Sequence, residues 1–258
     1  KSQEDFKILS TPKEFEEIAH NLQQQGITIY YGEWLVENYP HGFLIDFKKF
    51  LYEINFIKYE LWERFGIDSL RTEQDYNEPI AWSKSVSLFI KEIVKKDEWQ
   101  NSIFHFHEWL AGAGLLFIQD LKQKKIFTTH ATILGRTLAG TGINFWSELS
   151  TFDPLKLAYN FHIEAKHLVE KNSAIFCDVL TTVSNITAFE VEAFLGRKVD
   201  AILPNGIDLS KFPTFEEIAT QHRKNKNSIL NFILYFFSPY LKKSCPVKNS
   251  LIFFTSGR

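Results

Sequence analysis

Two histidines separated by one residue are the most informative polar groups in the sequence. His105 and His107 flank Phe106 at the end of a short apolar run. Alternate side chains of a β-strand point to the same face, so both imidazoles are expected on one side and Phe106 on the other. An imidazole at a strand end can hydrogen-bond a sugar hydroxyl or a phosphate. The alternative is a purely structural pair at a strand–helix junction, and a metal site is disfavoured because no third ligand is evident nearby.

Two further segments combine polar side chains with glycine. Thr128–Arg136 contains His130 and ends in a Gly-Arg pair, and such a loop suits an anionic or polyhydroxyl ligand. An ordinary surface loop would have the same composition. Pro204–Asp208 contains Asn205 and Gly206, a dipeptide that indicates a turn.

These segments follow predicted strands of one sheet. Strands are expected at 102–106, 125–129, 177–183 and 201–203, with helices at 109–122, 158–172 and 185–195 and a loop over 131–153. Strands that alternate with helices through short connections predict a parallel sheet, and near-continuous apolar strands predict helices on both faces. Ligands of such sheets bind beyond the carboxyl ends of the strands. The expected fold class is therefore α/β with a Rossmann-like sheet and a site at that edge.

The flanking regions show similar patterns. Helices are expected at 11–25, 48–65, 81–95 and 213–240, and further strands at 27–34, 42–47 and 251–255. No GxGxxG motif follows a strand, so a nicotinamide or flavin site is unsupported. Gly135 and Gly140 have the first spacing of a phosphate-binding loop, but Thr141 stands where that loop requires lysine.

Composition narrows the class of protein. The chain has 258 residues, 45% of them hydrophobic, which is enough for one large domain or two small ones. A net charge of −2 does not suggest a nucleic-acid-binding protein, and 25 Phe residues exclude intrinsic disorder. Two cysteines exclude a disulfide scaffold and favour a reducing compartment. No apolar run approaches the roughly 20 residues of a membrane span. The absence of methionine indicates a piece of a longer protein.

Five sequence blocks resemble the eukaryotic-type glycogen synthases, in the same order and with nearly the same spacing. They are His105–Gly112 (HFHEWLAG), Phe127–Arg136 (FTTHATILGR), Leu180–Ala188 (LTTVSNITA), Ile202–Ile207 (ILPNGI) and Phe253–Arg258 (FFTSGR). The first two are specific to that family, whereas ILPNGI is common among glycosyltransferases of the same architecture.

The resemblance implies a retaining glycosyltransferase of the two-domain GT-B fold. Such an enzyme transfers glucose from UDP-glucose to the non-reducing 4-hydroxyl of an α-1,4-glucan without a metal or other cofactor. Residues 1–250 would form the N-terminal Rossmann-like half, lacking its extreme amino terminus. Residues 251–258 would begin the linker to a missing nucleotide-binding domain, so the chain alone is expected to be inactive.

The resemblance also assigns roles to residues. We favour His107 as the histidine that orients the donor glucose and stabilises developing charge, with His105 as the alternative. Arg258 would clamp the departing diphosphate. The expected substrate-binding residues are Glu108, His130 and Arg136, which line the cleft, and Asn205 and Gly206, which shape its floor near the domain junction.

The implied partners are a nucleotide sugar and an α-glucan, with no nucleic acid and no membrane. A cytoplasmic location is expected, and a homo-oligomer would form through regions outside this chain. Two alternatives stay open: a GT-B enzyme with another nucleotide sugar or acceptor, and a non-catalytic domain that binds glucan or a protein partner.

Overall fold

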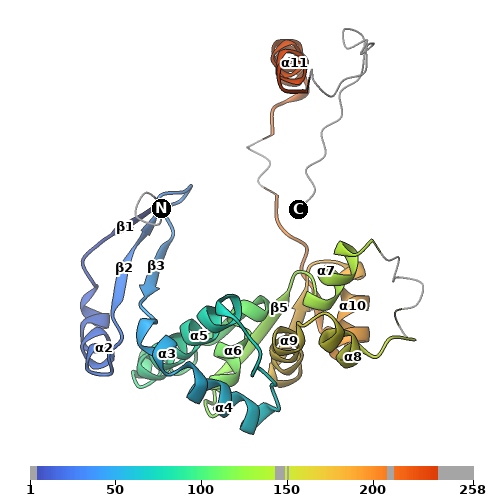
Figure 1. The fold of residues 1–258 in the computed structure, drawn as a ribbon. Coiled ribbons are helices and arrows are strands. Elements are labelled where there is room, and N and C mark those ends of the chain that lie inside the picture. Colours follow the sequence, from blue (N-terminus) through green and yellow to red (C-terminus); the bar gives the residue numbers. More distant parts are fainter. Residues whose placement is uncertain (1–4, 143–148, 150, 208–211, 238–258) are drawn as a thin grey trace. The chain divides into compact units, whose positions relative to one another are not determined.

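A computed structural model describes residues 5–142, 149, 151–207 and 212–237 of the chain (Figure 1). The chain divides into two compact units, Lys1–Asn205 and Gly206–Arg258, which are described separately below. A single domain over residues 1–250 followed by a linker stays a prediction, since residues 238–258, including the expected strand at 251–255, lie outside the described residues.

A four-stranded parallel sheet forms the centre of the first unit. It contains β4 (Ile103–His107), β5 (Lys124–Thr129), β6 (Val179–Thr182) and β7 (Ala201–Ile202), hydrogen-bonded in that order. The register pairs His107 with Thr128 and Thr128 with Thr181. The carboxyl ends of β4, β5 and β6 therefore lie side by side, as the sequence predicted.

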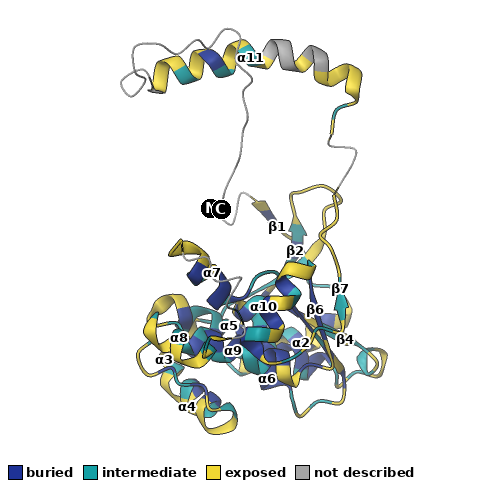
Figure 2. Cartoon of the chain, turned by 90° about the vertical axis from the view of Figure 1, so that its right-hand side faces the viewer, coloured by how far each residue is buried: buried dark blue, intermediate teal, exposed yellow. Residues whose placement is uncertain are grey.

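Helices flank this sheet, which confirms the predicted α/β class (Figure 1). They are α5 (Gln74–Ile93), α6 (Glu108–Phe117), α7 (Ile133–Gly140), α8 (Pro154–Asn160), α9 (Glu164–Phe176) and α10 (Asn185–Leu195). The central helix α6 packs against both α5 and α9. Phe106, Phe127 and Leu180 of the strands are buried in the shared core. Figure 2 shows this buried interior in α5, α6 and α9.

The amino-terminal strands form a separate antiparallel sheet, which the sequence did not predict. Its strands are β1 (Phe6–Ile8), β2 (Ile29–Trp34) and β3 (His41–Ile45), and α2 (Lys13–Gln24) lies between the first two in sequence. Only residues 35–40 separate β2 from β3, which is too short for a parallel crossover. Asn38 and Tyr39 turn the chain there with positive φ.

Several predicted segments differ in detail. The helix expected at 81–95 begins at Gln74 of α5, and the helix expected at 109–122 ends at Phe117 of α6. The helix expected at 48–65 is two helices, α3 (Lys48–Tyr52) and α4 (Ile54–Phe65). The helix expected at 158–172 is likewise divided into α8 and α9, with His162 at φ 57° between them. The loop expected at 131–153 contains α7, because the Thr132 side chain caps it by accepting a hydrogen bond from the Gly135 N–H.

The second unit contains one described helix, α11 (Phe215–Phe237), which agrees with the helix predicted over 213–240. Phe232, Tyr235 and Phe236 are exposed on it. Within the described part of the chain, neither α11 nor any other helix has the length and apolar character needed to cross a membrane.

Candidate functional site

His105 and His107 lie on the same face of β4 and are both exposed. Their ring centroids are 4.1 Å apart. Phe106 points the other way into the core, where it is 5% exposed. The predicted alternation is confirmed, and it brings two imidazoles to the carboxyl edge of the sheet.

His105 is attached to the neighbouring strands. Its Nε2 atom lies 2.6 Å from the Thr128 hydroxyl, which in turn lies 2.5 Å from the hydroxyl of Thr181. This row of polar groups crosses β4, β5 and β6 where their ends align. One ring nitrogen of His105 is therefore already occupied within the protein, which fits a structural role for this histidine.

His107 stands at the strand–helix junction and faces His130. It occupies the N-cap position of α6 without a capping hydrogen bond from its side chain. Its Nδ1 atom lies 3.3 Å from Nε2 of His130, which follows β5. Burial, and secondarily the charges of the other two imidazoles, hold the pKa of His107 below 6.5. The His107 ring is therefore mainly neutral at pH 7, so it acts as a hydrogen-bonding group.

Glu108 connects the two loop segments of the site. Its Oε1 atom accepts a 2.9 Å hydrogen bond from the backbone N–H of His130 and lies 3.3 Å from Nη2 of Arg136. The Arg136 side chain is 50% exposed, so its guanidinium can also reach a ligand. The backbone of Glu108 has φ 62°, an unusual conformation for a residue with a side chain. Such local strain is typical of functional sites.

The structure thus brings together five of the predicted site residues from the end of β4, the start of α6 and the segment after β5: His105, His107, Glu108, His130 and Arg136. Their catalytic and binding roles stay predictions. Asn205 is exposed after β7, and Gly206 is the first residue of the second unit. Arg258 lies outside the described residues.

Two buried glutamates beside this cluster were missed by the sequence analysis. Glu170 of α9 accepts hydrogen bonds of 2.9 Å from the Thr129 hydroxyl and from the Ile133 backbone N–H. Glu190 of α10 accepts one of 3.0 Å from the Thr132 hydroxyl. Burial raises the pKa of Glu170 to about 8 and also raises that of Glu190. The available signal was an acidic residue at an inward-facing position of each predicted helix.

Gly135 leaves space for this arrangement. A Cβ atom at this position would overlap the carboxylate of Glu190 and would lie 2.7 Å from the Thr132 hydroxyl. The glycine of the Gly-Arg pair is therefore required by packing, whereas the sequence analysis related it to ligand binding.

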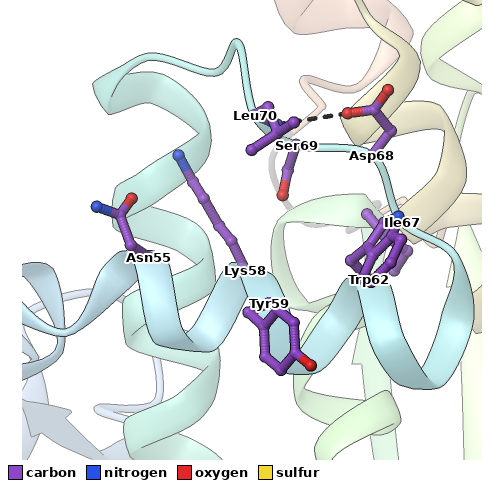
Figure 3. A pocket seen from close by; sticks show the side chains of 8 residues that line it. All are labelled: Asn55, Lys58, Tyr59, Trp62, Ile67, Asp68, Ser69 and Leu70. Atoms are coloured by element: carbon purple, nitrogen blue, oxygen red, sulfur yellow. Dashed lines mark hydrogen bonds between the residues drawn. The ribbon is translucent and has the colours of Figure 1, made fainter.

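A cavity of about 410 Å³ is lined by none of these site residues. Figure 3 shows it between α4 and the loop that follows this helix, lined by Asn55, Lys58, Tyr59, Trp62, Ile67, Asp68, Ser69 and Leu70. Its lining is mostly apolar, and nothing in the chemistry of the histidine cluster depends on it. Within the described residues, no group of three His, Cys, Asp or Glu side chains is arranged to hold a metal ion.

Comparison with known proteins gives one consistent family. The sequence profile described as glycogen synthase matches residues 4–258. The glycogen [starch] synthase of Neurospora crassa is 38% identical over 92% of this chain, and that of Dictyostelium discoideum is 35% identical over 93%. The liver glycogen [starch] synthase of Mus musculus is 32% identical over 92%. The matched regions are 34%, 27% and 34% of those proteins, so the chain spans about a third of their length.

Proposed function

Because this chain belongs to the glycogen synthase family, we propose that it supplies the amino-terminal half of a glucosyltransferase active site. The complete protein would transfer glucose from UDP-glucose, with retention, to the 4-hydroxyl at the non-reducing end of an α-1,4-glucan. One observation carries this proposal beyond the family match. His107, His130 and Arg136 converge at the carboxyl edge of a parallel sheet, where such folds bind ligands.

The charges of these groups suit a glucosyl donor. A neutral His107 can hydrogen-bond the glucose hydroxyls and stabilise charge that develops at the reacting sugar. His107 is not assigned as a base in this proposal. Arg136 adds a partly exposed guanidinium, which Glu108 orients without burying it.

The remaining predicted residues complete the proposal. Arg258 would stabilise the departing diphosphate, the largest change of charge in the reaction, through the bidentate geometry of its guanidinium. Asn205 and Gly206 would shape the floor of the cleft. Closure of a second domain would exclude water and protect the activated glucosyl group from hydrolysis. No metal or other cofactor takes part in this scheme.

The proposed partners are the nucleotide sugar and the glucan, with self-association through regions outside this chain. A cytoplasmic location is proposed from the substrates and the two cysteines. Neither nucleic acid nor a membrane is a proposed partner.

The direct test follows radiolabelled glucose from UDP-glucose into glycogen, with the complete protein encoded by the natural gene. Incorporation into polymer is the expected result. A folded, complete protein that incorporates no label would contradict the proposal. A panel of UDP- and ADP-sugars would then separate a different donor from the non-catalytic alternative.

A further inference from the structure

Carboxyl groups from three helices hold the segment from Thr129 to Arg136, which contains two of the site residues. Glu108 of α6 binds the N–H of His130 and the guanidinium of Arg136. Glu170 of α9 binds the Thr129 hydroxyl and the Ile133 N–H. Glu190 of α10 binds the Thr132 hydroxyl, which also accepts a 3.0 Å hydrogen bond from the Gly135 N–H.

The carboxyl groups of α9 and α10 differ from that of Glu108 because they are buried. Glu170 is 0% exposed and Glu190 is 7% exposed. Burying a polar, ionisable side chain is unfavourable unless hydrogen bonds compensate for the water that it loses. The hydrogen bonds of Glu170 and Glu190 are therefore what makes their burial tolerable. Among the described residues, the hydrogen-bond donors that meet their oxygens lie in the Thr129–Arg136 segment.

Each of these hydrogen bonds falls within three residues of His130 or Arg136. The two bonds of Glu170 fall on Thr129, immediately before His130, and on Ile133, the first residue of α7. The bond of Glu190 falls on Thr132, whose hydroxyl caps α7. Arg136 is the fourth residue of this helix, so its starting point depends on that cap. Loss of either carboxylate would loosen the backbone that carries His130 and Arg136.

We propose that Glu170 and Glu190 are positioning residues for glucosyl transfer, which fix His130 and Arg136 without touching the substrate. The inference rests on the proposed function. It adds to the site two buried residues of α9 and α10, the helices that carry Glu170 and Glu190. The physical reason is that small displacements of groups that orient a substrate greatly reduce its reaction rate.

Substitutions of the two glutamates in the complete protein test this role. Glu170→Leu and Glu190→Leu remove the acceptors and should each lower kcat about tenfold or more, with the KM for glycogen unchanged. Glu170→Gln, in contrast to Glu170→Leu, should keep kcat near that of the unmodified protein. Its amide oxygen can accept from the Ile133 N–H while its NH₂ group donates to the Thr129 hydroxyl.

A matched variant separates positioning from general destabilisation. Leu61 of α4 is fully buried, and its side chain cannot form a hydrogen bond with the Thr129–Arg136 segment. Leu61→Ala should lower the thermal midpoint while the turnover per folded molecule stays normal. An equal loss of turnover in Leu61→Ala would overturn the positioning role.

Hydrogen exchange gives a readout that does not depend on activity. In this chain, Glu170→Leu should speed exchange at the Ile133 amide, and Glu190→Leu at the Gly135 amide, while the amides of α5 stay protected. If the unmodified complete protein transfers no glucose, the proposed function fails. The exchange experiment still tests whether Glu170 and Glu190 hold the Thr129–Arg136 segment.

Two milder variants cover the case in which the leucine variants do not fold. Thr129→Val and Thr132→Val remove only the hydroxyls that the glutamates bind and should reproduce the fall in kcat. Unchanged kcat in these folded variants, or unchanged exchange at Ile133 and Gly135, would overturn the proposal.

Discussion

The carboxylate of Glu108 accepts a 2.9 Å hydrogen bond from the backbone N–H of His130, so the first residue of α6 holds the residue that follows β5. Glu108 makes this bond from a backbone with φ 62°. The contact therefore joins two strand ends through a residue in an unfavourable conformation. Its energetic cost and its contribution to the site can be measured separately.

Comparison of Glu108→Gly with Glu108→Ala isolates the strain. Both variants lose the bonds to His130 and Arg136, but only alanine keeps a Cβ atom at positive φ. We expect Glu108→Gly to be the more stable by about 1 kcal/mol, because a left-handed backbone costs residues with a side chain roughly that amount. This reverses the usual preference of a helix for alanine over glycine. Urea unfolding of this chain gives the difference, and equal or greater stability of the alanine variant would refute the strain.

The two histidines of β4 should respond differently to substitution. His107→Ala in the complete protein should lower turnover well over tenfold with a modest loss of stability, since its ring is exposed and faces His130. His105→Ala should mainly lower stability, by about 1 kcal/mol, because it removes the hydrogen bond to Thr128. Label incorporation and thermal melting, measured on both variants, test whether His107 acts in turnover and His105 in stability. Near-normal turnover of His107→Ala would contradict its assigned role.

Substitution of Gly135 should disturb the site through Glu190. In Gly135→Ala the new methyl group overlaps the Glu190 carboxylate and the Thr132 hydroxyl. We expect a loss of about 1–3 kcal/mol, as for other overpacked sites. The double variant Gly135→Ala/Glu190→Ala should recover part of that stability but not the turnover. Recovery of neither property would argue against the Glu190 carboxylate as the obstructing group. Thermal melting and label incorporation, measured on the complete protein, give the two results.

Much of the central sheet could be predicted from the sequence, because short apolar strands alternate with amphipathic helices. The same pattern located the polar residues after β4 and β5, since the carboxyl ends of parallel strands meet at one edge. The side shared by His105 and His107 followed from the two-residue period of a strand alone. Each of these inferences needs only local order along the chain.

The contacts that shape the site are not local, and sequence patterns do not contain them. Thr129 meets Glu170 across 41 positions and Thr132 meets Glu190 across 58. Glu190 stands between two apolar residues, and the polar run 170–173 has the composition of an ordinary solvent-exposed helix face. The helix α7 was missed because its glycines favoured a loop, while the capping role of Thr132 was overlooked. Two strands of the antiparallel sheet were predicted, at 27–34 and 42–47, but β1 was missed because the Phe6–Ile8 segment is too short to give a pattern.

Two buried groups of α9, Glu170 and His167, should make the stability of the folded chain depend on pH in opposite directions. Burial raises the pKa of Glu170 from 4.5 to about 8. Folding therefore favours its protonated form, and this contribution to stability is complete below pH 4.5 and lost as the pH rises toward 8. Burial, with a smaller effect of Lys171, lowers the pKa of His167 from 6.5 to about 4. Its contribution is complete above pH 6.5 and lost as the pH falls toward 4.

The corresponding variants should each remove one of these dependences. Relative to the unmodified chain, Glu170→Gln should gain stability progressively from pH 4.5 to 8, because an amide has no proton to lose. His167→Phe should gain relative stability as the pH falls from 6.5 to 4, because a phenyl ring cannot become charged in the core. Both ring nitrogens of His167 are buried without a hydrogen-bond partner among the described residues, so nothing there stabilises the cation. Urea unfolding of this chain across that pH range measures both differences, and a difference that stays constant with pH would show that the group concerned does not titrate in the folded state.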